Sequence, residues 1–137
     1  DNWLLKITPA LLKIYPYQLL IKAISTQVSV SQEGKKYMLN TLKGYSKNEI
    51  TEIMKEVYVE VQAYRENRTL KIPILLTYGA NEKTGKVQSY NKKWAESENL
   101  PLAIIPKAAH NANMDNSDFF NELSKDFIDE IEIRRDR

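Results

Sequence analysis

The spacing of apolar and polar residues divides this chain into two halves. Through residues 1–70 the apolar side chains recur at helical spacing, whereas residues 71–137 alternate short continuous apolar runs with amphipathic stretches. Helical spacing indicates helices that bury one face, and a short apolar run bounded by turn residues indicates a strand buried on both faces. The chain is therefore expected to form a helical region followed by a β-α-β-α unit, a fold of the α/β class.

Three helices are predicted in the first half. Thr8 followed by Pro9 is typical of a helix N-terminus, so the first helix is expected over residues 9–24, with a kink or break at Pro16. The second is expected over residues 31–42. The third follows a capping box formed by Ser46 and Glu49. Its apolar face consists of Ile50, Ile53, Met54, Val57, Tyr58, Val61 and Tyr64.

The second half predicts two strands, each followed by a helix. Residues 72–78 form an apolar run that ends at Gly79, and residues 102–105 form a second run. Helices are expected over residues 85–97 and from Ser117 onward, with Ser117 as the N-cap. The order strand, helix, strand, helix implies a right-handed crossover, and the two strands are expected to form a parallel pair.

Two polar loops follow these strands, over residues 79–85 and 106–116. They contain Glu82 and His110, which are 28 residues apart in the sequence. Parallel strands lie about 4.8 Å apart and their carboxyl ends share one edge of the sheet, so the two loops can touch. A carboxylate bound to one imidazole nitrogen would fix the tautomer and leave the other nitrogen free to act as a base. The sequence thus predicts Glu82 and His110 as a catalytic acid-base pair.

Other interpretations of these residues remain open. His110 is the only histidine of the chain, and a lone histidine in a loop is more often a surface or hydrogen-bonding residue than a catalyst. Asp115 competes with Glu82 as the acid partner. Its position ahead of Ser117 fits better with the start of the last helix, where an aspartate is favoured by the helix dipole, so Glu82 is ranked first.

Composition excludes several classes of protein. The chain has no cysteine, so it has neither a disulfide framework nor a thiol nucleophile, and one histidine with scattered carboxylates predicts no metal site. The net charge of +2 divides into +3 (10 − 7) for residues 1–70 and −1 (10 − 11) for residues 71–137. Neither half carries the basic patch expected of a nucleic-acid-binding protein. The four glycines form no phosphate-binding loop, and no cofactor is expected.

The most apolar stretch, over residues 9–24, is interrupted by charged and polar residues and by Pro16, so it predicts no membrane span. No secretory signal is recognisable, and the absence of cysteine makes a cytoplasmic protein the default expectation. The chain begins at Asp1 without an initiator methionine, which suggests a piece of something longer.

From residue 71 onward the chain resembles the C-terminal third of an α/β hydrolase of the serine esterase or lipase type. IPILLTYGANEKTG is similar to that family's penultimate strand and acid turn, and the acid position is Glu82. PLAIIPKAAHNANMDNSDFFNELSKDFI is similar to the last strand, the histidine loop and the last helix, and the matching histidine is His110. Residues 1–70 match, less specifically, the helical cap that many members insert.

This resemblance implies a truncated α/β-hydrolase fold, with a cap region over residues 1–70 and the C-terminal βαβα part of the core over residues 71–137. Two features depart from the family. Glu82 stands where aspartate is usual, which the family tolerates, and the nucleophile motif G-x-S-x-G is missing. The resemblance therefore implies that the serine of a Ser-Glu-His triad lies upstream. The parent enzyme would hydrolyse carboxylic esters, and this chain alone would be inactive.

The resemblance also sets expectations about substrate and partners. The cap would shape the acyl pocket, with Tyr15, Tyr17, Met54 and Tyr58 as lining residues, although each also fits the hydrophobic core. A two-strand sheet with exposed apolar faces implies an oligomer, a swapped assembly or complementation by the missing N-terminal part. The alternative function is a non-catalytic small-molecule-binding or protein-interaction module on the same scaffold.

Overall fold

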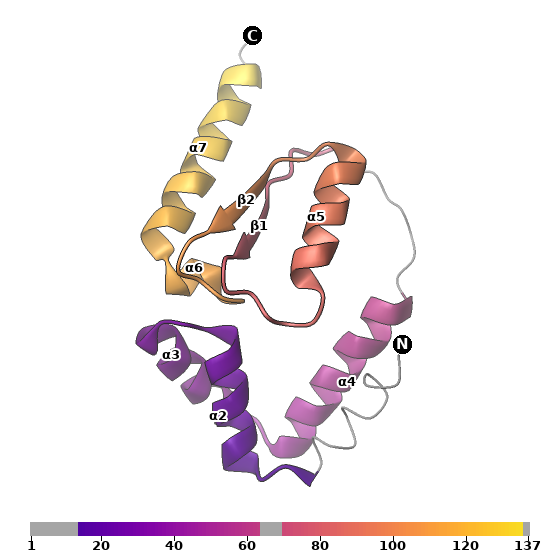
Figure 1. Ribbon diagram of the computed structural model, residues 1–137, viewed down its shortest axis with the longest axis vertical. Coiled ribbons are helices and arrows are strands. Elements are labelled where there is room, and N and C mark those ends of the chain that lie inside the picture. Colours follow the sequence, from indigo (N-terminus) through magenta and orange to yellow (C-terminus); the bar gives the residue numbers. More distant parts are fainter. Residues whose placement is uncertain (1–13, 64–69, 136–137) are drawn as a thin grey trace.

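The computed structural model of the protein describes residues 14–63 and 70–135, with the side chains of residues 58–63 left out. A helical half precedes a half built on two strands (Figure 1). The elements are α2 (Tyr17–Val28), α3 (Gln32–Leu42), α4 (Lys47–Ala63), β1 (Leu76–Gly79), α5 (Val87–Glu98), β2 (Leu102–Ile105), α6 (Ala112–Asp115) and α7 (Ser117–Arg135). The predicted α/β class is confirmed at this level.

The predicted break at Pro16 is confirmed. The backbone is not helical at Tyr15 and Pro16, and α2 begins directly after them. Residues 9–13 of the first predicted helix lie outside the described residues. The helix runs beyond its predicted end at Ile24, because no glycine or proline interrupts it before Ser29 turns to an extended conformation (φ −138°, ψ 146°).

The starts of α3 and α4 follow their capping residues. The Ser31 hydroxyl accepts a hydrogen bond from the Gly34 N–H at 3.0 Å. The predicted capping box is present: the Ser46 N–H donates to Glu49 Oε2 at 2.7 Å, and the Glu49 N–H donates to Ser46 Oγ at 3.3 Å. Local side-chain bonding therefore determines where both helices begin.

A hydrophobic cluster holds the helical half together. Its buried centre consists of Leu20, Ile21 and Ile50, from α2 and α4. Partly buried apolar side chains pack around it: Tyr17, Ile24, Leu39, Leu42 and Met54. The Tyr17 hydroxyl lies within hydrogen-bond distance of the carbonyl oxygens of Leu42 (3.2 Å) and Tyr45 (3.0 Å), which ties α2 to the end of α3.

The two strands are parallel, as predicted, with Leu76 opposite Leu102 and Gly79 opposite Ile105. The prediction that β1 starts at residue 72 is wrong, because its pairing begins only at Leu76, whose N–H donates to the Pro101 carbonyl at 3.0 Å. Pairing can extend only as far as the partner strand reaches. Ile72 and the residues after it are apolar but have no strand opposite them among the described residues.

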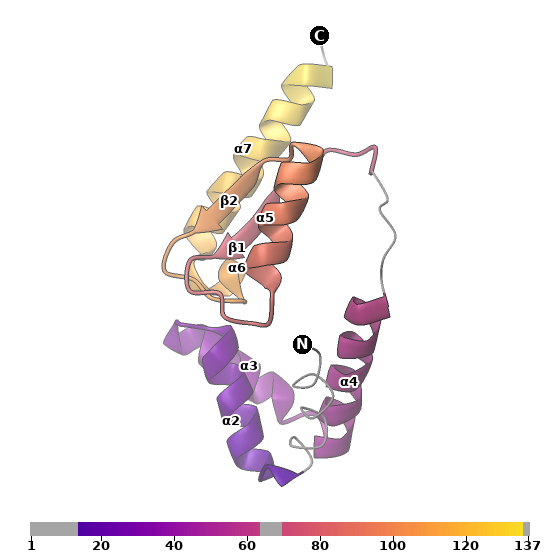
Figure 2. The same ribbon diagram turned by 45° about the vertical axis from the view of Figure 1, so that its right-hand side comes forward.

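Helices α5 and α7 lie on opposite sides of the sheet (Figures 1 and 2). Helix α5 starts two residues later than predicted, because Gly85 takes a left-handed conformation (φ 55°) that a right-handed helix cannot include. Helix α7 begins with Ser117, so Ser117 is its first helical residue and not the predicted N-cap, and the short helix α6 ahead of it was not predicted. Within the described part of the chain, no helix is long and apolar enough to cross a membrane.

The helical half lies at the carboxyl ends of the strands. The strand arrows in Figure 1 point toward α6 and toward the hairpin formed by α2 and α3. Helices α3 and α6 are in contact. The loop that follows β2 reaches the end of α2, where the Asn111 N–H donates to the Val28 carbonyl at 2.8 Å.

Candidate functional site

The loops after β1 and β2 cross each other at Gly79. A Cβ atom on this glycine would lie 2.2 Å from the carbonyl oxygen of Ala109 and 2.3 Å from that of Ala108, closer than any side chain allows. Two backbone hydrogen bonds join the loops here: Ala80 N–H to Ile105 O and Asn81 N–H to Ala108 O, both at 2.8 Å. We call the loop after β1, which contains Glu82, the acid loop, and the loop after β2, which contains His110, the histidine loop. A glycine at the end of β1 therefore lets the histidine loop pass directly over the acid loop.

Glu82 occupies the tight turn that follows Gly79. Its N–H donates to the Gly79 carbonyl at 2.9 Å, and its own carbonyl accepts from Gln88 Nε2 at 2.6 Å. The carboxylate oxygen Oε1 accepts from the Thr84 N–H at 2.5 Å. Only 2% of the Glu82 side chain is exposed. The Thr84 N–H holds the carboxylate inside the turn, and Gln88 holds the Glu82 backbone.

Two opposing influences set the pKa of Glu82. Burial is the largest, and it would raise the pKa because it disfavours the charged form. Hydrogen bonds to the carboxylate, first from the Thr84 N–H and then from the His110 ring, lower it, and together they bring the pKa below its ordinary value of 4.5. Glu82 is therefore ionised at neutral pH.

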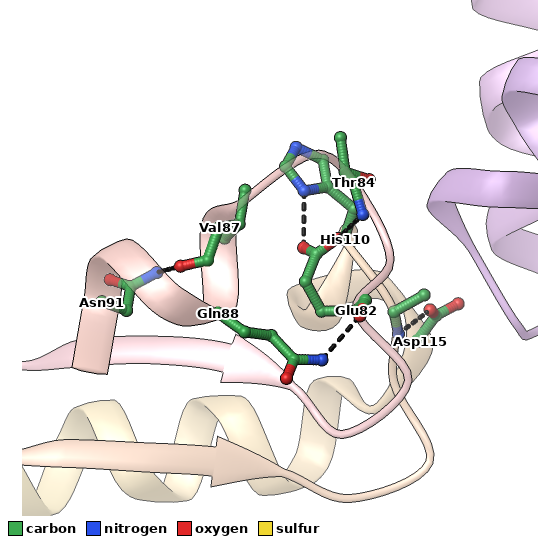
Figure 3. Close-up of polar contacts among 8 residues, drawn as sticks. Glu82, Thr84, Val87, Gln88, Asn91, His110 and Asp115 are labelled. Atoms are coloured by element: carbon green, nitrogen blue, oxygen red, sulfur yellow. Dashed lines mark hydrogen bonds and ion pairs between the residues drawn. The ribbon is translucent and has the colours of Figure 1, made fainter. Parts of the chain in front are cut away.

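His110 lies beside this carboxylate, with Nδ1 at 2.7 Å from Glu82 Oε2 (Figure 3). The predicted contact between the two loops is thus present. An ionised carboxylate can only accept hydrogen bonds, so Nδ1 carries a proton and the neutral ring has its lone pair on Nε2. No described residue forms a hydrogen bond with Nε2, and 42% of the His110 side chain is exposed. The arrangement can take up a proton at Nε2 while Glu82 orients the ring and stabilises the imidazolium.

A hollow of about 260 Å³ adjoins this pair. Its walls come from β1, α5, α6 and α7: Thr77, Tyr78, Glu82, Val87, His110, Ala112, Asn113 and Phe120. Among the described residues, β1 pairs only with β2, so its other edge has unpaired backbone groups. The imidazole therefore stands near an open sheet edge.

The alternative acid, Asp115, does not contact His110. Its carboxylate accepts hydrogen bonds from the N–H groups of Val30 (3.0 Å), Ser31 (3.0 Å) and Ala109 (2.8 Å), and from the Ser31 hydroxyl (2.8 Å). The interpretation of Asp115 as a dipole partner at the start of the last helix is wrong. It ends α6 instead, and its oxygens face the turn between α2 and α3.

The pKa of Asp115 is also lowered. Burial would raise it, but the hydrogen bonds from Ala109, Val30 and Ser31 outweigh burial and bring the pKa below its ordinary value of 3.8. Asp115 is therefore a charged anchor between the two halves.

A second, larger hollow of about 690 Å³ runs between α2 and the two loops. We call it the cap groove, and it is lined by Tyr15, Leu19, Lys22, Ala23, Thr26, Gln27, Val30, Asn81, Lys83 and Ala109. Of the four predicted substrate-binding residues, Tyr15 lines the cap groove, whereas Tyr17 and Met54 pack in the helical cluster. The side chain of Tyr58 lies outside the described residues.

Several residues of this site were not predicted. Thr84 holds Glu82 through its backbone N–H, and Gln88 holds it through its side-chain amide. Neither residue type indicates such a role in the sequence. The contact of Ser31 with Asp115 joins residues 84 positions apart. The sequence predicts Ser31 as the start of a helix, and nothing in it indicates Asp115 as a second partner.

No group of three or more potential ligands is placed to hold a metal ion within the described ranges. The chain matches no protein-family model, no curated protein and no solved structure significantly. Functional inference therefore depends on the geometry of Glu82 and His110.

Proposed function

We propose that Glu82 and His110 are the acid and the base of a Ser-Glu-His triad in a carboxylic ester hydrolase of the α/β-hydrolase type. The serine is contributed by a segment outside this chain. The observation that carries the proposal is the 2.7 Å contact between Nδ1 and a buried, ionised carboxylate, with Nε2 left without a partner among the described residues.

In the proposed reaction, Nε2 of His110 removes the proton from the serine hydroxyl as the serine oxygen attacks the ester carbonyl. The resulting imidazolium is stabilised by Glu82, which stays ionised. The proton then passes to the departing alkoxide as the carbon–oxygen bond breaks, leaving an acyl-serine. Water repeats the sequence with the same base, releasing the carboxylic acid and restoring the serine.

The position of the pair supports this proposal. Glu82 and His110 follow neighbouring parallel strands at their carboxyl ends, where catalytic groups of open parallel sheets gather. The hollow beside His110 adjoins the unpaired edge of β1, and a further strand on that edge would bring its own loop to the same place. The chain order of acid before histidine also agrees with that family.

The cap groove is the proposed site of the acyl chain. It combines the apolar side chains of Leu19 on α2 and Val30 in the turn after α2 with loop residues that flank the pair, including Lys83 and Ala109. Tyr15 is then the aromatic residue at the cap side. Because this chain has no G-x-S-x-G, we expect no ester hydrolysis from it alone.

The second candidate is a non-catalytic binding protein. The cap groove favours it, because a hollow of about 690 Å³ is large enough for a small molecule and requires no nucleophile. In this case His110 and Glu82 would contribute a polar contact rather than proton transfer.

The sequence encoded upstream of Asp1 separates the two candidates. A G-x-S-x-G motif after a buried strand supports the enzyme, and an upstream sequence without it supports the binder. With the motif present, the longer polypeptide should hydrolyse p-nitrophenyl esters and react with a fluorophosphonate. His110→Ala should abolish both, whereas Glu96→Gln, an exposed carboxylate on α5, should change neither. Turnover that survives His110→Ala would overturn the proposed mechanism.

A further inference from the structure

The backbone on each side of His110 is tied to the turn between α2 and α3. Before it, the Ala109 N–H donates to Asp115 Oδ2 at 2.8 Å. After it, the Asn111 N–H donates to the carbonyl oxygen of Val28, the last residue of α2, at 2.8 Å. His110 therefore lies between two anchored peptide groups, one fixed by a side chain and one by the backbone.

The carboxylate of Asp115 is the centre of these ties. Oδ1 accepts from the N–H and the hydroxyl of Ser31, and Oδ2 accepts from the N–H groups of Val30 and Ala109. Hydrogen bonds to an ionised acceptor are stronger than neutral ones, and here one side chain receives four. The Ser31 hydroxyl also accepts from the Gly34 N–H, so the network continues into the first turn of α3.

Packing around this network leaves no spare room. A Cβ atom on Gly34 would lie 2.7 Å from Ser29 Oγ, 2.8 Å from Ser31 Oγ and 3.0 Å from Asp115 Oδ1. Ser29 is itself only 1% exposed. A closely packed network of this kind has few alternative arrangements, so a change at its centre is transmitted to the groups bonded to it.

We propose that Asp115 is a positioning residue, which locks the α2–α3 turn against the histidine loop and so keeps the His110 imidazole on Glu82. This inference rests on the proposed function for its catalytic meaning, whereas its structural content concerns the Glu82–His110 contact alone. It assigns the helical half a second task besides lining the cap groove. Through residues 28–31, the helical half fixes the orientation of the His110 imidazole.

Replacing Asp115 by asparagine tests the inference with little change in shape. An asparagine has one acceptor oxygen, and its amide nitrogen is a donor that would face N–H groups at the other position. Either the Ser31 N–H or the N–H groups of Val30 and Ala109 must then lose their acceptor. We expect the loop to relax and the His110 ring to move away from Glu82.

The readout is the imidazole of the chain itself. His110 is the only histidine, so ¹⁵N-labelled protein gives a single imidazole spin system. A proton on Nδ1 bound to a buried carboxylate should give a low-field resonance protected from exchange with water. Asp115→Asn should abolish this resonance or move it toward that of a water-exposed ring. The matched control is Asp118→Asn, which makes the same charge change on an exposed residue three positions away.

A resonance in Asp115→Asn identical to that in the control would overturn the inference. Should Asp115→Asn fail to fold, by circular dichroism, Ser31→Ala decides instead. It removes one hydrogen bond to Oδ1, together with the cap bond from the Gly34 N–H, and leaves the carboxylate in place. A weakened or more rapidly exchanging signal in Ser31→Ala supports the inference, and an unchanged one overturns it.

Kinetics of the longer, nucleophile-bearing polypeptide separate this inference from the proposed function. There we expect Asp115→Asn to lower kcat about 100-fold with little change in KM, as a displacement of about 1 Å in a catalytic group can do. Ester turnover that is absent from the unmodified polypeptide refutes the proposed function but leaves the resonance test intact. An unchanged resonance in Asp115→Asn refutes the inference even where turnover is present.

Discussion

The backbone of Ala109 packs so closely on Gly79 that no side chain fits between them: a Cβ atom on Gly79 would lie 2.2 Å from the Ala109 carbonyl oxygen. The acid loop and the histidine loop are stacked at this point. The contact explains why the strand that precedes Glu82 ends in glycine.

We therefore expect Gly79→Ala to destabilise the protein by about 1–3 kcal/mol, the usual cost of forcing extra atoms into a packed site. The obstacle is backbone, which cannot rotate away as a side chain can. Chemical denaturation measures the change in the free energy of unfolding. Gly44→Ala is the control, because its nearest neighbour would be 3.3 Å away, and an equal loss in the two variants would contradict the argument.

Glu82→Gln should both destabilise the fold and release His110. The glutamine keeps the shape but replaces one charged acceptor by an amide donor, which faces either the Thr84 N–H or the imidazole. Leaving a buried group without its partner costs about 1–3 kcal/mol. Denaturation and the imidazole NMR spectrum should both report the change, and Glu96→Gln should leave them as in the unmodified chain.

Acid should weaken the structure through the carboxylates of Glu82 and Asp115. The pKa values of Glu82 and Asp115 are lowered in the folded state, so each contributes stability that is present above the unfolded pKa and is lost as pH falls through the folded one. With ordinary values of 4.5 and 3.8, the loss begins near pH 4.5 and continues below pH 3.8.

The measurement is the free energy of unfolding from pH 7 to pH 2. Relative to the unmodified chain, Asp115→Asn should show a smaller loss across the acid range. If the free energy of unfolding of Asp115→Asn falls with pH in parallel with that of the unmodified chain, Asp115 does not contribute to the acid sensitivity.

Exposed apolar surface predicts association. Among the described side chains, Ile104 on β2 is 51% exposed and Ile128 on α7 is 54% exposed, and no residue of α7 is buried. Two strands also make a small sheet with an unpaired edge. We expect light scattering to give a mass above 15.9 kDa, and Ile128→Lys to lower the apparent mass. A monodisperse monomer would contradict this prediction.

Local signals predicted most of the elements. The N-cap serine of α3, Ser31, and the capping box of Ser46 and Glu49 depend on residues near one another in the sequence, and they mark the starts of α3 and α4. The parallel pair, and the meeting of Glu82 with His110, followed from the order of strands and helices and the handedness of the crossover. Catalysis by this pair stays a prediction.

What the sequence did not predict depends on contacts between distant segments. The start of β1 is set by the reach of β2, and the short helix α6 has too few residues to show a period. The binding of Asp115 to Val30 and Ser31 joins two halves of the chain, and an aspartate ahead of a helix carries no sign of such a partner. Tyr17 and Met54 fitted either a pocket or a core, and packing placed them in the core.

The two contacts that hold His110 in place differ greatly in the length of chain between their partners. A single βα crossover of 28 residues brings Glu82 and His110 together, whereas the bond from Asp115 to Val30 spans 85 residues. Closing a longer loop costs more entropy, and contacts between distant residues form more slowly than local ones. The acid-histidine pair should accordingly assemble early in folding, and the helical half should dock on it afterwards, so that the last step of folding also fixes the histidine.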